Sequence, residues 1–136
     1  MRRHHTEARD ETAAWRAVAR ESLQAFDLIF MPRAYGLQPQ DGARRAADHL
    51  RAGQALMQPI IDRYVTAART PMGRAWRRRA AMRGAYVRAF EEALAHALAR
   101  SADAPEPAWP RLYNRGSLPL IHRHTGDRCT LGEESR

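Results

Sequence analysis

The sequence predicts an all-α protein: a small bundle of three main helices, the second kinked or split, followed by an irregular C-terminal tail. Two observations predict this fold. Apolar residues recur at three- and four-residue spacing in three long stretches, which is the pattern of one buried helix face. Clusters of proline and glycine separate these stretches and mark the loops. The length of 136 residues fits one domain of modest size, and an apolar content of 44% is enough for a core.

The first predicted helix spans residues 6–30. Thr6 or Asp10 can cap its N-terminus, where acidic side chains also suit the positive end of the helix dipole. Its apolar stripe consists of Trp15, Val18, Ala19, Ser22, Phe26, Ile29 and Phe30. Three helix breakers follow, so residues 31–40 are predicted to form a loop. The breakers are Pro32, Gly36 and Pro39.

The second predicted helix runs from a cap at Asp41 to about Ala68. Its apolar stripe consists of Ala46, Ala47, Leu50, Met57, Ile60, Ile61, Tyr64 and Ala68. Gly53 and Pro59 lie inside it, and a proline there removes a backbone hydrogen bond and clashes with the preceding turn. A kink, or a break into two helices, is therefore predicted near Gln54–Pro59.

The third predicted helix starts at Thr70-Pro71, a capping hydroxyl followed by a proline in the first helical position, and ends near Arg100. Its apolar stripe consists of Met72, Trp76, Tyr86, Phe90, Ala93, Leu94 and Ala97. Three prolines then prevent the helix from continuing, so the chain divides into a helical bundle at 1–104 and a tail at 105–136.

The tail is too apolar to be free in water, and it is predicted to pack across the bundle in extended form. Its apolar residues are Trp109, Leu112, Tyr113, Leu118, Leu120 and Ile121. Thr125-Gly126-Asp127 is a candidate turn for a short hairpin, although Pro119 weakens the strand before it.

Charge is the most informative feature for function. The chain carries a net charge of +8, and residues 69–90, which we call the basic segment, hold seven arginines and no acid. They are Arg69, Arg74, Arg77, Arg78, Arg79, Arg83 and Arg88. The chain has no lysine, and the codon bias of a GC-rich genome explains that preference but not this clustering. A positive field so localised indicates an anionic partner.

On a helical wheel the arginines of the basic segment fall into two classes. Four lie opposite the apolar stripe, namely Arg74, Arg77, Arg78 and Arg88. Arg79 and Arg83 fall within the stripe, between Trp76 and Tyr86. One interpretation is that their stems cover the core while their heads reach water or an acid on another helix. The candidate acids are Glu21, Asp27, Asp48 and Asp62. The other interpretation is that this part of the helix extends beyond the core and presents arginines all round.

The composition therefore predicts a non-catalytic, nucleic-acid-associated protein that binds the phosphate backbone with low sequence specificity, as a small subunit of a larger assembly. Trp76 and Tyr86 would add base stacking to the arginine contacts. The predicted binding residues are Arg69, Arg74, Trp76, Arg77, Arg78, Arg79, Arg83 and Arg88. The alternative is a helical adaptor or inhibitor whose arginines dock on an acidic protein surface. A homo-oligomer is compatible with both.

Other partners and chemistries have weaker signals. A basic amphipathic helix also suits anionic lipid, but alanines end its apolar face, so membrane binding is not expected. The scattered histidines with the single cysteine are a poor metal pattern, and neither a metal nor another cofactor is predicted. These residues are His4, His5, His122, His124 and Cys129. Glu92 and His96, one helical turn apart, are interpreted as a surface hydrogen-bonded pair rather than an acid–base pair. No motif predicts an enzyme, and one cysteine agrees with a cytoplasmic protein.

Overall fold

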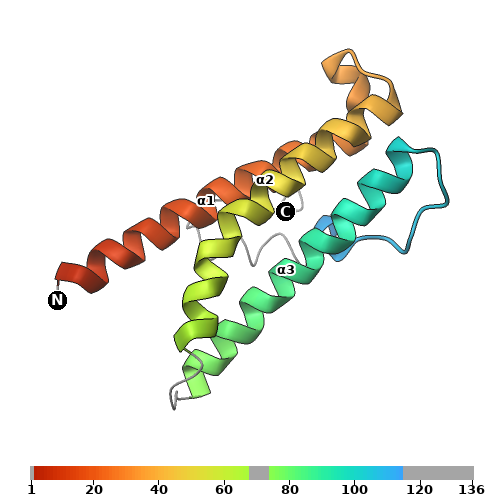
Figure 1. Ribbon diagram of the computed structural model, residues 1–136. Coiled ribbons are helices and arrows are strands. Elements are labelled where there is room, and N and C mark those ends of the chain that lie inside the picture. The colour runs from red at the N-terminus through yellow and green to blue at the C-terminus, as the bar shows by residue number, and fades with distance from the viewer. Residues whose placement is uncertain (1, 68–73, 115–136) are drawn as a thin grey trace, which may run out of the picture.

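The computed structural model describes the backbone of residues 2–67 and 74–114, and the side chains of residues 11–63, 81 and 83–114. Three α-helices dominate it (Figure 1). They are α1 (Arg2–Phe30), α2 (Pro39–Ala67) and α3 (Arg74–Ser101). Two short 3-10 helices follow α1 and α3, namely η1 (Pro32–Tyr35) and η2 (Arg111–Tyr113). The described ranges contain no strand, so the predicted three-helix, all-α fold is confirmed.

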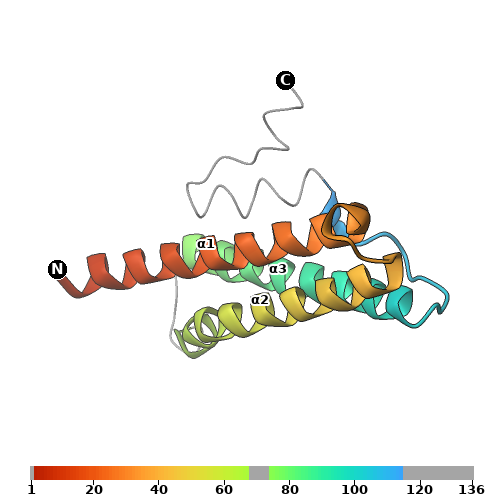
Figure 2. The ribbon, with the colours of Figure 1, turned by 90° about the horizontal axis from the view of Figure 1, so that it is seen from above.

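The middle helix, α2, packs along both α1 and α3 (Figure 2). Small side chains allow this close approach, since Ala43, Ala46 and Ala47 of α2 are fully buried. Gly53 has the same role against α3. A Cβ atom at this position would lie 2.6 Å from Cε1 of Phe90, well inside a van der Waals contact. Close packing of the core thus needs small residues on α2 as well as the large residues that face them.

The start of α2 differs from the prediction. The helix begins at Pro39, two residues before the predicted cap at Asp41. A proline suits the first helical position because the N–H that it lacks would have no partner there. Asp41 lies inside the first turn, where its Oδ1 accepts a hydrogen bond of 3.0 Å from Nη1 of Arg44. The predicted loop at 31–40 is shorter for this reason, and it contains η1.

The middle of α2 follows one of the two predicted alternatives. The helix continues through Pro59 without a break. Figure 1 shows its axis changing direction along the yellow to yellow-green part. The ring of Pro59 excludes a hydrogen bond to the carbonyl of Ala55, which is the usual cause of a kink. The second helix is therefore bent rather than split.

The predicted stripe of α1 is buried over most of its length, with two differences. Trp15, Val18 and Ala19 form part of the core, but Phe30 at the end of the stripe is 41% exposed. The helix also begins at Arg2 instead of residue 6, because residues 2–5 contain no helix breaker. Thr6 and Asp10 therefore lie within the helix and do not cap it.

The end of α3 reverses the chain. Asp103 adopts a left-handed conformation with φ of 52°, and the N–H of Ala104 donates a 2.9 Å hydrogen bond to the carbonyl of Ala99. This is the geometry of a Schellman motif, which satisfies carbonyl groups at a helix end. The chain then returns along α3, and Leu112 and Tyr113 of η2 are buried against the helices. The predicted helix start at Thr70-Pro71 and the predicted hairpin beyond residue 114 lie outside the described residues.

Candidate nucleic-acid interface

The structure describes the predicted binding residues to different extents. Arg69 lies outside the described residues. Five others belong to the first two turns of α3, where the backbone is described and the side chains are not. They are Arg74, Trp76, Arg77, Arg78 and Arg79. Only Arg83 and Arg88 have described side chains, and their environments differ.

Arg83 and Arg88 mark the two sides of α3. Arg88 is exposed, whereas Arg83 is only 4% exposed. The two positions are separated by about 140° around the helix axis, at about 100° per residue. Because α3 is one unbroken helix, the same rotation places the positions of residues 74, 77 and 78 within about 80° of Arg88. The position of residue 79 lies about 40° from Arg83. The burial of Arg83 and the exposure of Arg88 agree with the two classes that the wheel predicted, and the side chains of the other arginines lie outside the described residues.

An ion pair with Glu11 of α1 holds Arg83. Its Nη2 donates to Oε1 of Glu11 at 2.5 Å, and the side chains of Arg83 and Glu11 are 5% and 22% exposed. The same Oε1 accepts a 3.3 Å hydrogen bond from Nε1 of Trp15. The ring of Trp15 in turn packs on Tyr86, with 5.1 Å between the ring centroids. This small cluster joins α1 to α3 and neutralises one arginine of the basic segment.

Glu11 was not among the four acids that the sequence indicated for this role. Each of those four is engaged elsewhere. The contacts are Glu21 with His49 at 2.6 Å, Asp27 with Tyr35 at 3.2 Å, Asp48 with Arg51 at 3.7 Å and Asp62 with Gln58 at 2.8 Å. A signal for Glu11 was present in the sequence. It lies one helical turn before Trp15, so it is an acid on the apolar stripe of α1, as Arg83 is an arginine on that of α3.

The predicted base-stacking role fits Tyr86 poorly. Tyr86 is only 3% exposed and packs against Trp15, so its ring belongs to the core. The side chain of Trp76, the other predicted stacking residue, is outside the described part of the chain.

The predicted pair of Glu92 and His96 is wrong, because the two side chains have separate partners. His96 is 1% exposed, and its Nε2 lies 3.1 Å from Oε2 of Glu106. Glu92 instead accepts hydrogen bonds from Arg111, the shortest 2.6 Å from Nη2. These bonds lower the pKa of Glu92 below its usual value. The chain segment after α3 decides both pairings, since it brings Glu106 and Arg111 back to the helix.

No metal site is found in the part of the chain that the structure describes, which contains no group of three potential ligand residues. The histidines and the cysteine that the sequence analysis considered lie beyond the described side chains. They are His4, His5, His122, His124 and Cys129.

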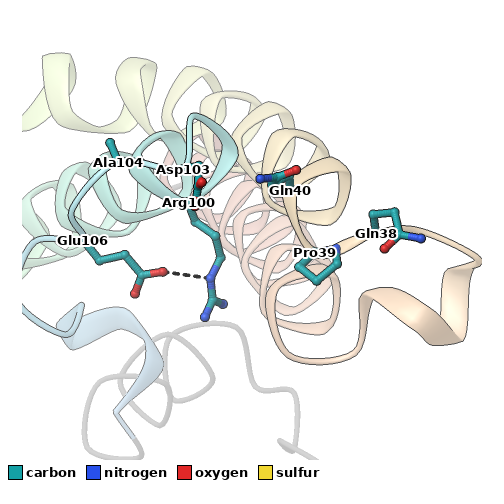
Figure 3. A pocket seen from close by; sticks show the side chains of 7 residues that line it. All are labelled: Gln38, Pro39, Gln40, Arg100, Asp103, Ala104 and Glu106. Atoms are coloured by element: carbon teal, nitrogen blue, oxygen red, sulfur yellow. Dashed lines mark hydrogen bonds and ion pairs between the residues drawn. The ribbon is translucent and has the colours of Figure 1, made fainter.

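An open, polar pocket of about 420 Å³ lies between the start of α2 and the end of α3 (Figure 3). It is lined by Gln38, Pro39, Gln40, Arg100, Asp103, Ala104 and Glu106. The cation of this pocket is already engaged, since Nε of Arg100 donates to Oε1 of Glu106 at 2.9 Å and Nη1 contacts the carbonyl of Ile29 at 3.5 Å. The pocket therefore offers no uncompensated positive charge, and it lies at the other end of α3 from residues 74–78.

Comparisons with models of known protein families, with curated proteins and with solved structures gave no match. Among the described residues, no helix is both long enough and apolar enough to cross a membrane.

Proposed function

We propose that this protein binds nucleic acid through the basic segment, as a non-catalytic part of a larger nucleoprotein assembly in the cytoplasm. The observation that carries the proposal is the concentration of seven arginines, without a single acid, in residues 69–90. Arginine grips phosphate oxygens with two parallel hydrogen bonds, and a cluster of arginines attracts a polyanion from a distance. Such contacts fix a phosphate backbone without selecting a base sequence.

The ion pair with Glu11 narrows the proposed contact residues. Arg83 is buried and its charge is compensated, so we leave it out of the interface. Arg88 is exposed, and the positions of residues 74, 77 and 78 share its side of α3. The proposed interface is therefore one side of the helix, with Arg74, Arg77, Arg78 and Arg88 as phosphate contacts.

Salt dependence tests this proposal. Fluorescence anisotropy would measure the affinity for labelled single- and double-stranded oligonucleotides over a range of salt concentrations. Affinity should fall steeply with salt, because each neutralised phosphate releases condensed counterions. Replacing Arg74, Arg77 and Arg78 together by Gln should reduce the slope of log K against log salt by about three units for a B-form duplex.

A matched control separates the interface from net charge. Arg20, Arg33 and Arg45 are exposed and lie outside the basic segment, so the triple replacement by Gln removes the same charge elsewhere. This control should leave the slope nearly unchanged. If both triple variants have the same effect, or if the full-length protein does not bind oligonucleotides, the proposal is wrong. Docking of the arginines on an acidic protein surface would then be the better interpretation.

A further inference from the structure

The described large apolar side chains that remain exposed gather at one place. Four of the five lie where α1 ends, in and next to η1, and in the segment before η2. They are Phe30, Met31, Tyr35 and Trp109, with exposures of 41%, 49%, 44% and 51%, and we call them the aromatic corner. The fifth, Leu98, lies about 200° around α3 from the buried His96, on another side of that helix.

Side-chain contacts hold three residues of the aromatic corner in place. The rings of Phe30 and Trp109 pack edge to face with 5.4 Å between centroids, and both contact the ring of Tyr113 beneath them. The hydroxyl of Tyr35 donates to Asp27, one turn before the end of α1. The rings of Phe30 and Trp109 thus rest on the buried ring of Tyr113, and the hydroxyl of Tyr35 is bound to α1, before any partner arrives. Anchors of this kind lose little conformational entropy on binding.

The charges at the aromatic corner balance one another. The charged residues of 26–35 and 106–113, together with their ion-pair partners, are three acids and three arginines. They are Asp27, Glu92, Glu106, Arg33, Arg100 and Arg111. Four of the six form the pairs Arg100–Glu106 and Arg111–Glu92. Burying this corner would therefore leave few charges without an opposite charge nearby. Burying the basic segment would instead leave several arginines without one.

We propose that the occupant of the aromatic corner is the same corner of a second copy of this chain, in an isologous dimer. Two copies with a net charge of +8 each repel one another unless they meet at a neutral surface. The aromatic corner is such a surface. His96 of α3 contacts the ring of Trp109 and lies 19 residues after Arg77, which is about 28 Å along the helix and well beyond the Debye length of about 8 Å in physiological salt.

The exposed area is of the size that a dimer needs. A large aromatic side chain has about 200 Å² to bury, so the three half-exposed rings leave about 100 Å² each, and with a similar area for Met31 the corner offers about 400 Å². Two corners together supply about 800 Å² of apolar surface. A standard interface buries about 1,600 Å² in total, of which somewhat more than half is apolar.

The dimer itself does not depend on the proposed nucleic-acid function, but one consequence does. The two basic segments would lie on the far sides of the dimer, so that one dimer could hold two stretches of nucleic acid. Linked sites of this kind bind more tightly than each site alone.

Sedimentation equilibrium of the full-length chain without nucleic acid tests the dimer. We expect a dimer that persists as salt is raised, because its contacts are apolar. Trp109→Ser and Met31→Ser should each raise the dimer dissociation constant about tenfold or more while circular dichroism shows unchanged helix content. Leu98→Ser, which removes an exposed apolar side chain outside the corner, is the matched control and should leave the dimer intact.

Cross-linking tests the isologous geometry. In a Cys129→Ser background, Met31→Cys should form a disulfide-linked dimer on mild oxidation, whereas Ala55→Cys on the exposed side of α2 should not. A monomer at all concentrations would overturn the proposal, as would a dimer that Trp109→Ser and Met31→Ser leave unchanged. Replacing Arg74, Arg77 and Arg78 by Gln should weaken nucleic-acid binding, with the reduced salt slope given above, and preserve the dimer, so each of the two proposals can fail without the other.

Discussion

Two regions join α1 to α3, and they do so by different interactions. Towards the start of α3 the contact is the buried Glu11–Arg83 ion pair beside Trp15 and Tyr86. Towards its end Tyr113 of η2 makes the connection, because its ring contacts both Phe26 of α1 and His96 of α3. The first region places an arginine–glutamate ion pair in the core, while the second is built mainly from contacts between rings. The difference is that the arginine-rich start of α3 contributes Arg83 to the core together with an acid from α1, whereas the end of α3 needs no such pair with α1.

The largest expected change in the free energy of unfolding comes from breaking the ion pair between Glu11 and Arg83. Glu11→Gln keeps an acceptor for Trp15 but removes the negative charge that Nη2 of the buried Arg83 contacts. Since Arg83 and Glu11 are 5% and 22% exposed, we expect the free energy of unfolding to fall by about 3 kcal/mol, measured by denaturant titration. Arg83→Leu alone should also destabilise the protein, because it leaves the carboxylate of Glu11 partly buried.

A double variant tests whether the loss of stability comes from an uncompensated charge. Glu11→Leu with Arg83→Met replaces both charges by apolar groups, which should restore the free energy of unfolding to near the original value. If Glu11→Gln unfolds at the same denaturant concentration as the original protein, Arg83 finds compensation elsewhere, and the contrast between the two regions is smaller than the structure indicates.

A smaller change, this time an increase in the free energy of unfolding, is expected from a substitution in the ring cluster. The hydroxyl of Tyr113 is buried and has no hydrogen-bond partner among the described residues, and burial raises its pKa well above the usual value. Tyr113→Phe removes this unpaired polar group and should raise the free energy of unfolding by about 1 kcal/mol. Tyr35→Phe is the control, because its hydroxyl is exposed and paired with Asp27, so its removal should change stability little. A loss of stability in Tyr113→Phe would show that its hydroxyl binds a water or another group.

The smallest expected change in stability comes from removing the hydrogen bonds between Glu92 and Arg111. Hydrogen bonds from Arg111 lower the pKa of Glu92 in the folded state, so the stability that they contribute is present above the pKa of an unfolded glutamate. It should be lost as the pH falls through the lowered pKa of the folded state. Glu92→Gln should therefore be slightly less stable than the original protein near neutral pH. The difference should disappear in acid, which denaturant titrations at several pH values would detect. A difference independent of pH would contradict this assignment.

The periodic patterns in the sequence were sufficient to predict the three helices. A helix that buries one face has apolar residues at three- and four-residue spacing, and this spacing can be read from the sequence alone. Trp15, Leu50 and Phe90 were each placed on a buried stripe, and each is buried. The helix boundaries were less certain. Pro39 was interpreted as a breaker but begins α2, since a proline is favourable in the first turn and unfavourable later.

The same distinction between local and tertiary information applies to the arginines of the basic segment. The sequence located the basic segment and separated its arginines into two classes, because charge and helix register depend on neighbours along the chain. It did not identify the partner of Arg83, because the choice among acids depends on which residues of α1 and α3 meet across the bundle. Glu11 is 72 residues away from Arg83 in the chain.

The sequence by itself thus determined the three helices and the concentration of positive charge, both of which arise from interactions within one element, whereas the bend of α2 in place of a split was decided by the structure. Only the tertiary structure decided that Glu11 neutralises Arg83, that Glu106 rather than Glu92 contacts His96, and that Phe30 and Trp109 meet at the surface. Each of these pairs joins residues from different elements. Such contacts depend on how the helices pack and on where the chain turns back after α3. Neither can be read from the spacing of apolar residues within a single helix.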